Sequence, residues 1–323
     1  IKNMKRKVIK QGNNTLTITL PRKWTERFGI HAGDEINLEE QDHALLLRSE
    51  KVTPLDVSAE ISFHGLNQPI LWRQMISAYR AGYDTIKIHF DPQAVYRNIY
   101  TSYADFNKKI SVSSIEVVRD AFNGLIGMEI IEHKKDFCVV KDLGEITDKE
   151  FDNALRRIFF LIEGMAEDSL HLIKDKKDSL LKGVDITDTT IDRFTDYCLR
   201  VLNKKGYKQF KKTPVIYSIV LSLEYIGDEY KRVSYHLFLS KSKFSIKGKE
   251  LFEDTNKLFS LFHSAFYDFK KDKIVQLYEE TEKLKKKIIS NKLNEDEKEV
   301  VHHLKKIIRF ITDLIQLRID LES

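Results

Sequence analysis

The chain has 323 residues, 42% of them hydrophobic and 32% charged, with a formal net charge of +5. This length favours roughly two or three domains over one core, and the composition is that of a folded, soluble protein rather than a disordered one. Its longest apolar stretch, residues 215–223, is too short to cross a bilayer. Its start lacks an apolar leader, and its two cysteines give no disulfide framework. We therefore expect a cytoplasmic protein without membrane insertion.

Charge is unevenly distributed at the beginning of the chain. Residues 1–27 carry eight basic residues and one acid, whereas residues 28–50 carry six acids and one arginine. Such a concentrated positive segment is typical of a surface that contacts nucleic-acid phosphates. The simpler alternative is a solvated surface, which is the usual role of a run of charges.

The first fifty residues predict a strand, a strand, a short helix and two more strands. A strand near Val8 is followed by a turn at residues 12–14, whose glycine and asparagines tolerate a positive φ. Residues 15–20 alternate threonine with Leu16, Ile18 and Leu20, which we expect to face the core. The remaining expected elements are a helix over residues 22–28, which Pro21 begins and Gly29 ends, and strands at residues 36–38 and 44–47 across a turn at residues 41–43.

A unit this small buries little surface alone, so we expect an obligate dimer. The residues that carry a family resemblance are Gly12, Ile18-Thr19-Leu20-Pro21-Arg22-Lys23-Trp24, Gly29-Ile30 and Ala32-Gly33-Asp34-Glu35-Ile36. Over about Lys5 to Arg48 the chain resembles the AbrB/MazE/SpoVT swapped-hairpin family.

The resemblance implies a homodimer, in which two interleaved chains form one small β-barrel that binds DNA. Family members also act as antitoxins through a short tail, but more than 270 residues follow residue 50 here, which favours a regulator. Lysine and arginine would contact phosphates, while arginine and asparagine can also bind base edges. The positions that match the DNA-binding surface are Lys5, Arg6, Lys7, Lys10, Asn13, Asn14, Arg22 and Lys23.

The middle segment, residues 51–146, predicts a small α/β domain. Apolar residues at helical spacing indicate helices, and β-branched runs between turn residues indicate strands. We see no catalytic motif in this segment, and we assign no role to its histidines. The expected elements are helices over residues 69–81 and 115–122 and strands over residues 85–89, 128–132 and 137–141.

From residue 147 to residue 323 the strand signals end and amphipathic segments follow one another. Their apolar residues repeat every three or four positions, which predicts a bundle of antiparallel helices. The six expected helices span residues 148–174, 183–204, 213–240, 245–270, 272–291 and 294–322.

Two pairs of carboxylates stand out in these helices. Asp188 and Asp192 are four residues apart, as are Glu224 and Asp228, so each pair shares one helix face. Together they could offer oxygen ligands to a hard or borderline cation, and their angular position predicts a site on the bundle surface. The alternative is an ordinary ion pair, because Asp228 has Lys231 three residues later and Arg232 four residues later.

The run Leu223-Glu224-Tyr225-Ile226-Gly227-Asp228-Glu229 is similar to the Glu-x-x-Gly-Asp signature of the PhoU family. The resemblance covers about residues 148–322 and implies a six-helix bundle of two three-helix repeats. It also implies a role in phosphate uptake and a divalent or ferric metal ion at Glu224 and Asp228, with Asp188 and Asp192. In the second repeat Arg309 stands in place of the glutamate, which leaves at most half of the family's metal site.

The sequence therefore predicts a multidomain α+β protein that resembles archaeal phosphate uptake regulators, with domains at residues 1–50, 51–146 and 147–323. We expect a dimeric DNA-binding transcriptional regulator whose helical domain senses a signal or a partner. The alternative is an adaptor that binds a phosphate transporter or a signalling protein, with the barrel serving only to dimerise. We do not expect an enzyme, because the chain contains no P-loop, dinucleotide-binding, metalloprotease or serine-hydrolase motif.

Overall fold

The computed structural model describes residues 5–41, 44–49, 57–97, 111–144, 147–290 and 292–323. It has a multidomain α+β fold with two compact units, Ile1–Asp56 and Val57–Ser323, called unit 1 and unit 2 below. Unit 2 contains two separate hydrophobic cores, one in its α/β part and one in its helical part. Among the described helices, none is long and apolar enough to cross a membrane.

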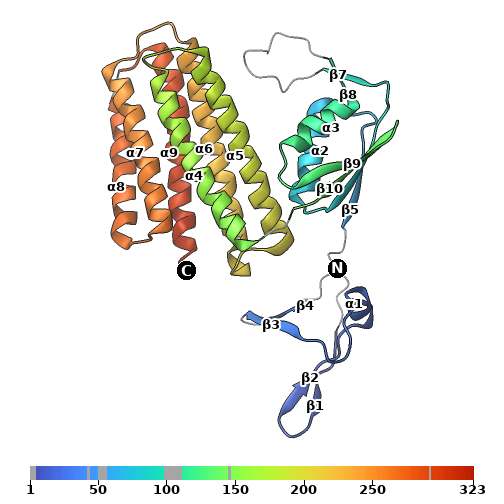
Figure 1. Ribbon diagram of the computed structural model, residues 1–323. Helices are drawn as coiled ribbons and strands as arrows, with labels where there is room; N and C mark the ends of the chain where they lie inside the picture. Colours follow the sequence, from blue (N-terminus) through green and yellow to red (C-terminus); the bar gives the residue numbers. More distant parts are fainter. Residues whose placement is uncertain (1–4, 42–43, 50–56, 98–110, 145–146, 291) are drawn as a thin grey trace. The chain divides into compact units, whose positions relative to one another are not determined.

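Unit 1 has the predicted order of elements (Figure 1). Its hairpins are antiparallel, and Gly12 adopts a φ of 70° in the first turn. Pro21 lies immediately before the helix, as expected. Asp42 and His43 of the second predicted turn lie outside the described residues. The elements are β1 (Ile9–Gln11), β2 (Thr15–Thr17), α1 (Arg22–Arg27), β3 (Ile36–Gln41) and β4 (Ala44–Ser49).

Unit 1 leaves its apolar side chains exposed in the single chain. The prediction that Leu16 and Ile18 face a core is wrong here, since they are 70% and 50% exposed, while Leu20 is half-buried. The physical reason is size: five short elements do not enclose a core of their own. A barrel between two chains would cover these residues, and the predicted barrel and dimer stay predictions.

The α/β part of unit 2 is built on a four-stranded sheet of order β5-β6-β10-β9, in which only β5 and β6 are parallel. Leu71, Met75 and Tyr79 of the first helix are fully buried in its core. The predicted helices and strands are present, and three short strands, β5, β7 and β8, were not predicted. The elements are β5 (Ser58–Ser62), α2 (Gln68–Arg80), β6 (Thr85–His89), β7 (Val95–Arg97), β8 (Ser111–Ser113), α3 (Ser114–Asn123), β9 (Met128–His133) and β10 (Phe137–Asp142).

The helical part has the six long helices that the sequence predicts (Figure 1). The first three pack against one another and so do the last three, and the two groups meet through α6 with α9 and α4 with α7. Thr147 and Asn294 begin α4 and α9 with capping boxes. The helices are α4 (Asp148–His171), α5 (Asp178–Lys205), α6 (Thr213–Leu239), α7 (Ile246–Tyr267), α8 (Lys271–Ser290) and α9 (Glu295–Asp320).

The α/β part and the bundle are joined by buried charge between α2, β10 and α5. The Arg200 side chain, only 1% exposed, donates hydrogen bonds to the backbone oxygen of Tyr79 and to Asp142 at 2.7 and 2.6 Å. Arg80 of α2 pairs with buried Asp196 of α5. Each buried charge therefore has an opposite charge beside it, as burial requires.

Candidate functional site

The first candidate site is the basic surface of unit 1. Lys5, Arg6 and Lys7 precede β1, Lys10 lies within it, Asn13 and Asn14 form its turn, and Arg22 and Lys23 begin α1. All eight side chains are exposed. Arg22 is paired with Glu26 through a 2.7 Å hydrogen bond. The set contains six cations. The five other than Arg22, which are Lys5, Arg6, Lys7, Lys10 and Lys23, have no acidic partner among the described residues.

These five cations carry positive charge that no acidic side chain neutralises among the residues that the structure describes. Exposed lysine and arginine bind phosphates by releasing condensed counterions, so affinity falls as salt rises. The arrangement is chemically suited to a polyanion, and the DNA-binding role of the eight residues stays a prediction.

Exposed apolar side chains accompany the basic residues in unit 1. Large apolar side chains left exposed in such a number favour a contact with another chain when they lie together. Such a contact between two copies would also bring two sets of cations onto one assembly. The exposed apolar residues, each 50–70% accessible, are Val8, Ile9, Leu16, Ile18, Leu38 and Leu45.

The second candidate site is a strip of carboxylates on α5 and α6. Asp188, Asp192 and Asp196 follow one another at four-residue spacing on α5, and Glu224 and Asp228 lie on α6. Burial and the neighbouring carboxylates raise the pKa of Asp192 to about 8. Burial first, and then Asp228, raises the pKa of Glu224 to about 7. Desolvation and mutual repulsion therefore favour the protonated, neutral forms of Asp192 and Glu224.

Cationic side chains neutralise most of this strip. Lys231 contacts Asp188 at 2.5 Å, and Arg232 contacts Asp228 at 2.7 Å. The Asp228–Arg232 pair confirms the ion pair that the spacing suggested, whereas Lys231 reaches across to α5 instead. The expectation that these carboxylates lie on the bundle surface is wrong for Asp188, which is 4% exposed because Lys231 of the neighbouring helix lies over it.

Asp192 and Glu224 are the two predicted metal ligands that keep no cationic partner within hydrogen-bonding distance in the described part of the chain. Across those same residues, no group of three or more histidine, cysteine, aspartate or glutamate side chains is placed to hold a metal ion. The four carboxylates thus do not assemble a cation site in this arrangement, because lysine and arginine already bind two of them. The metal site stays a prediction.

Sequence reasoning missed Asp196 and Arg80 in this strip, and it assigned Lys231 to Asp228 instead of Asp188. A signal for Asp196 was present, because it continues the four-residue spacing of Asp188 and Asp192. Arg80 could not be found, since it lies 116 residues before its partner Asp196 and belongs to the α/β part.

Comparison with known proteins gives one family match and a structural likeness. Residues 9–54 match the family described as "Antidote-toxin recognition MazE, bacterial antitoxin". Among solved structures, the chain is similar to the phosphate transport system regulatory protein PhoU from Streptococcus pneumoniae. The TM-score is 0.47 at 13% sequence identity, over 55% of this chain and 95% of that chain. No curated protein sequence gives a match.

Proposed function

We propose that the protein is a dimeric transcriptional regulator in which unit 1 binds DNA and the helical part of unit 2 receives a signal. The observation that supports this most is the set of five exposed, unpaired cations on unit 1. These residues lie in and beside a segment that matches a swapped-hairpin family. A dimer would double the positive surface, and phosphate contacts would supply affinity and a fast association.

The target genes that we propose are those for phosphate uptake. This part of the proposal rests on the sequence likeness of residues 223–229 to the PhoU signature. A regulator of this design needs a signal that binds one conformation of unit 2 better than another.

The test is binding of the full chain to fragments of its own genomic DNA, with the recovered fragments sequenced over a series of salt concentrations. We expect enrichment of promoters for phosphate uptake, and an affinity that falls steeply as salt rises. Absence of any enrichment at low salt would contradict DNA binding.

A double variant separates the regulator from the adaptor. Arg22→Ala with Lys23→Ala removes four charges from a dimer, and we expect DNA affinity to fall by at least about tenfold with a shallower salt dependence. The matched control, Lys174→Ala with Lys182→Ala, removes the same charge from exposed positions of unit 2 and should leave affinity unchanged. DNA affinity that survives the first variant would favour an adaptor whose unit 1 only dimerises.

A further inference from the structure

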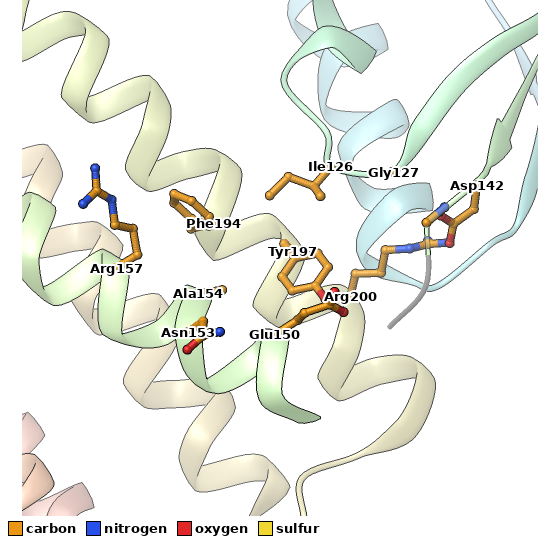
Figure 2. A pocket seen from close by; sticks show the side chains of 11 residues that line it. Ile126, Gly127, Asp142, Glu150, Asn153, Ala154, Arg157, Phe194, Tyr197 and Arg200 are labelled. Atoms are coloured by element: carbon orange, nitrogen blue, oxygen red, sulfur yellow. The ribbon is translucent and has the colours of Figure 1, made fainter. Parts of the chain in front are cut away.

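A cavity of about 540 Å³ lies between the α/β part and the bundle within unit 2 (Figure 2). One side is formed by the loops that flank β9 and β10, with Ile126 and Gly127 before β9 and Gly144 after β10. Helices α4 and α5 form the other side. This volume is within the range of small-molecule sites, and such sites are common where two parts of a protein meet.

The middle of the cavity is apolar and aromatic. Ile126, Ala154, Phe194 and Tyr197 line it, and Figure 2 shows these side chains between Arg157 on one side and Arg200 with Asp142 on the other. Burial raises the pKa of Tyr197 to about 12, so its hydroxyl is neutral at physiological pH. A flat apolar group would therefore be in contact with two aromatic rings.

The acids of the cavity already have partners. Glu150 accepts hydrogen bonds from the backbone and hydroxyl of Thr147 at 3.1 Å. Asp142 accepts from Arg200 and lies near Lys204. Asp142 therefore has opposite charge beside it, and Glu150 is held by its hydrogen bonds to Thr147.

The two arginines, in contrast, have unused donors. Arg157 is exposed and has no ion-pair partner among the described residues. The Nε of Arg200 is a buried donor without a hydrogen-bond partner in the same residues, although the side chain is only 1% exposed. This nitrogen is closed to the cavity, so Arg157 is the arginine that is available to a bound anion.

We propose that this cavity binds a small aromatic oxyanion, a carboxylate or a phosphate. Arg157 binds the oxyanion through its planar pair of N–H donors, which match carboxylate and phosphate geometry. The ring packs against Phe194 and Tyr197. A ligand in this position contacts both parts of unit 2, so its binding stabilises their contact.

The test uses the full chain and four probes, with affinities from calorimetry or ligand-observed NMR. The probes are benzoate, phenyl phosphate, inorganic phosphate and the neutral benzyl alcohol. We expect at least one of the two aromatic oxyanions to bind, and the tighter one identifies the charged group. Arg157→Gln should weaken that oxyanion by at least tenfold and change benzyl alcohol by less than twofold. The matched control is Arg193→Gln, which removes an exposed arginine beside Phe194 that does not line the cavity.

Three outcomes would overturn the proposal. One is no binding of either oxyanion at millimolar concentration. Another is equal loss of affinity in the Arg157 and Arg193 variants, which would indicate a general effect of charge. The third is inorganic phosphate binding as tightly as phenyl phosphate, which would mean that Phe194 and Tyr197 contribute nothing to binding. DNA binding is not involved in any of these measurements, so they are independent of the proposed regulatory function.

Discussion

Unit 1 and unit 2 differ in how far they bury their apolar side chains. In unit 1 no described residue is buried, and Leu16 is 70% exposed. In unit 2 the helical part alone encloses a continuous core that runs through all six helices. Unit 2 can therefore be stable as one chain. Unit 1 requires further burial of its apolar side chains, which a second copy would provide.

The two units also differ in their charged residues. The cations of unit 1 whose side chains are described are exposed, and among the described residues only Arg22 has an acidic partner. The buried charges of unit 2, such as Arg200 and Asp188, lie against opposite charges. Exposed charge is available to a partner, and buried paired charge fixes how elements pack. Binding to a polyanion is therefore expected from unit 1, whereas in unit 2 the paired charges hold neighbouring elements together.

The largest effect should come from the core of the bundle. Phe159 is fully buried, stacks on the His263 ring with centroids 4.6 Å apart, and contacts the tilted Phe266 ring at 5.0 Å. Phe159→Ala should lower the free energy of unfolding by about 3–5 kcal/mol, measured by urea denaturation. Its neighbour Phe160 is 50% exposed, and Phe160→Ala should cost less than about 1 kcal/mol.

The same pair of variants examines the independence of the two units. At a temperature where the Phe159 variant is still folded, its dimerisation and DNA affinity should equal those of the unaltered chain. A loss of DNA binding in the folded variant would mean that the bundle core supports unit 1 directly.

The next effect should appear in unit 1 as a change of assembly. Ile18 is 50% exposed in the single chain and is expected at the dimer contact. Ile18→Asp would bury two unpaired charges in a dimer, so the dimer dissociation constant should rise by at least about 30-fold. Sedimentation over a range of concentrations measures this directly.

Ile289→Asp is the control for the assembly measurement. Ile289 is 83% exposed on α8, so an added charge there should leave the mass unchanged. If the Ile18 variant also sedimented as a dimer, the dimer contact would have to lie outside this face of unit 1.

The contrast between the units also explains which elements could be predicted. The six bundle helices begin and end within a few residues of the expected bounds, because long helices with a buried stripe carry a repeated signal. Strand β5 (Ser58–Ser62) has serine at both ends and lies at the sheet edge, and β7 and β8 have three residues each. Such short segments carry too few alternating positions to stand out.

The sites show the same limit. Spacing within one helix placed Asp188 with Asp192 and Glu224 with Asp228, because helical periodicity fixes which side chains share a face. The Lys231–Asp188 pair joins two helices, and its geometry depends on how these helices pack. Exposure of Leu16 could not be predicted either, since the alternation shows that one face is apolar and leaves open which chain covers it.

The smallest effect should be the pH dependence caused by the carboxylate strip of unit 2, which unit 1 lacks. The pKa of Asp192 is raised from 3.8 to about 8, so the folded chain holds this proton more tightly than the unfolded chain. The stabilisation that this proton gives to the folded chain is fully present below about pH 4 and is lost as pH rises through 8. Asp192→Asn cannot titrate, so relative to the unaltered chain it should gain roughly 1–2 kcal/mol between pH 5 and pH 9.

Thermal or urea unfolding in a buffer with a chelator measures this gain, because a bound cation would otherwise hold the carboxylates charged. Glu167→Gln, at an exposed position of α4, is the control and should follow the unaltered chain at every pH. If the stability of the Asp192 variant had the same pH dependence as the control, the proton would reside elsewhere in the strip. Glu224 would then be the next group to replace, because its pKa is raised to about 7.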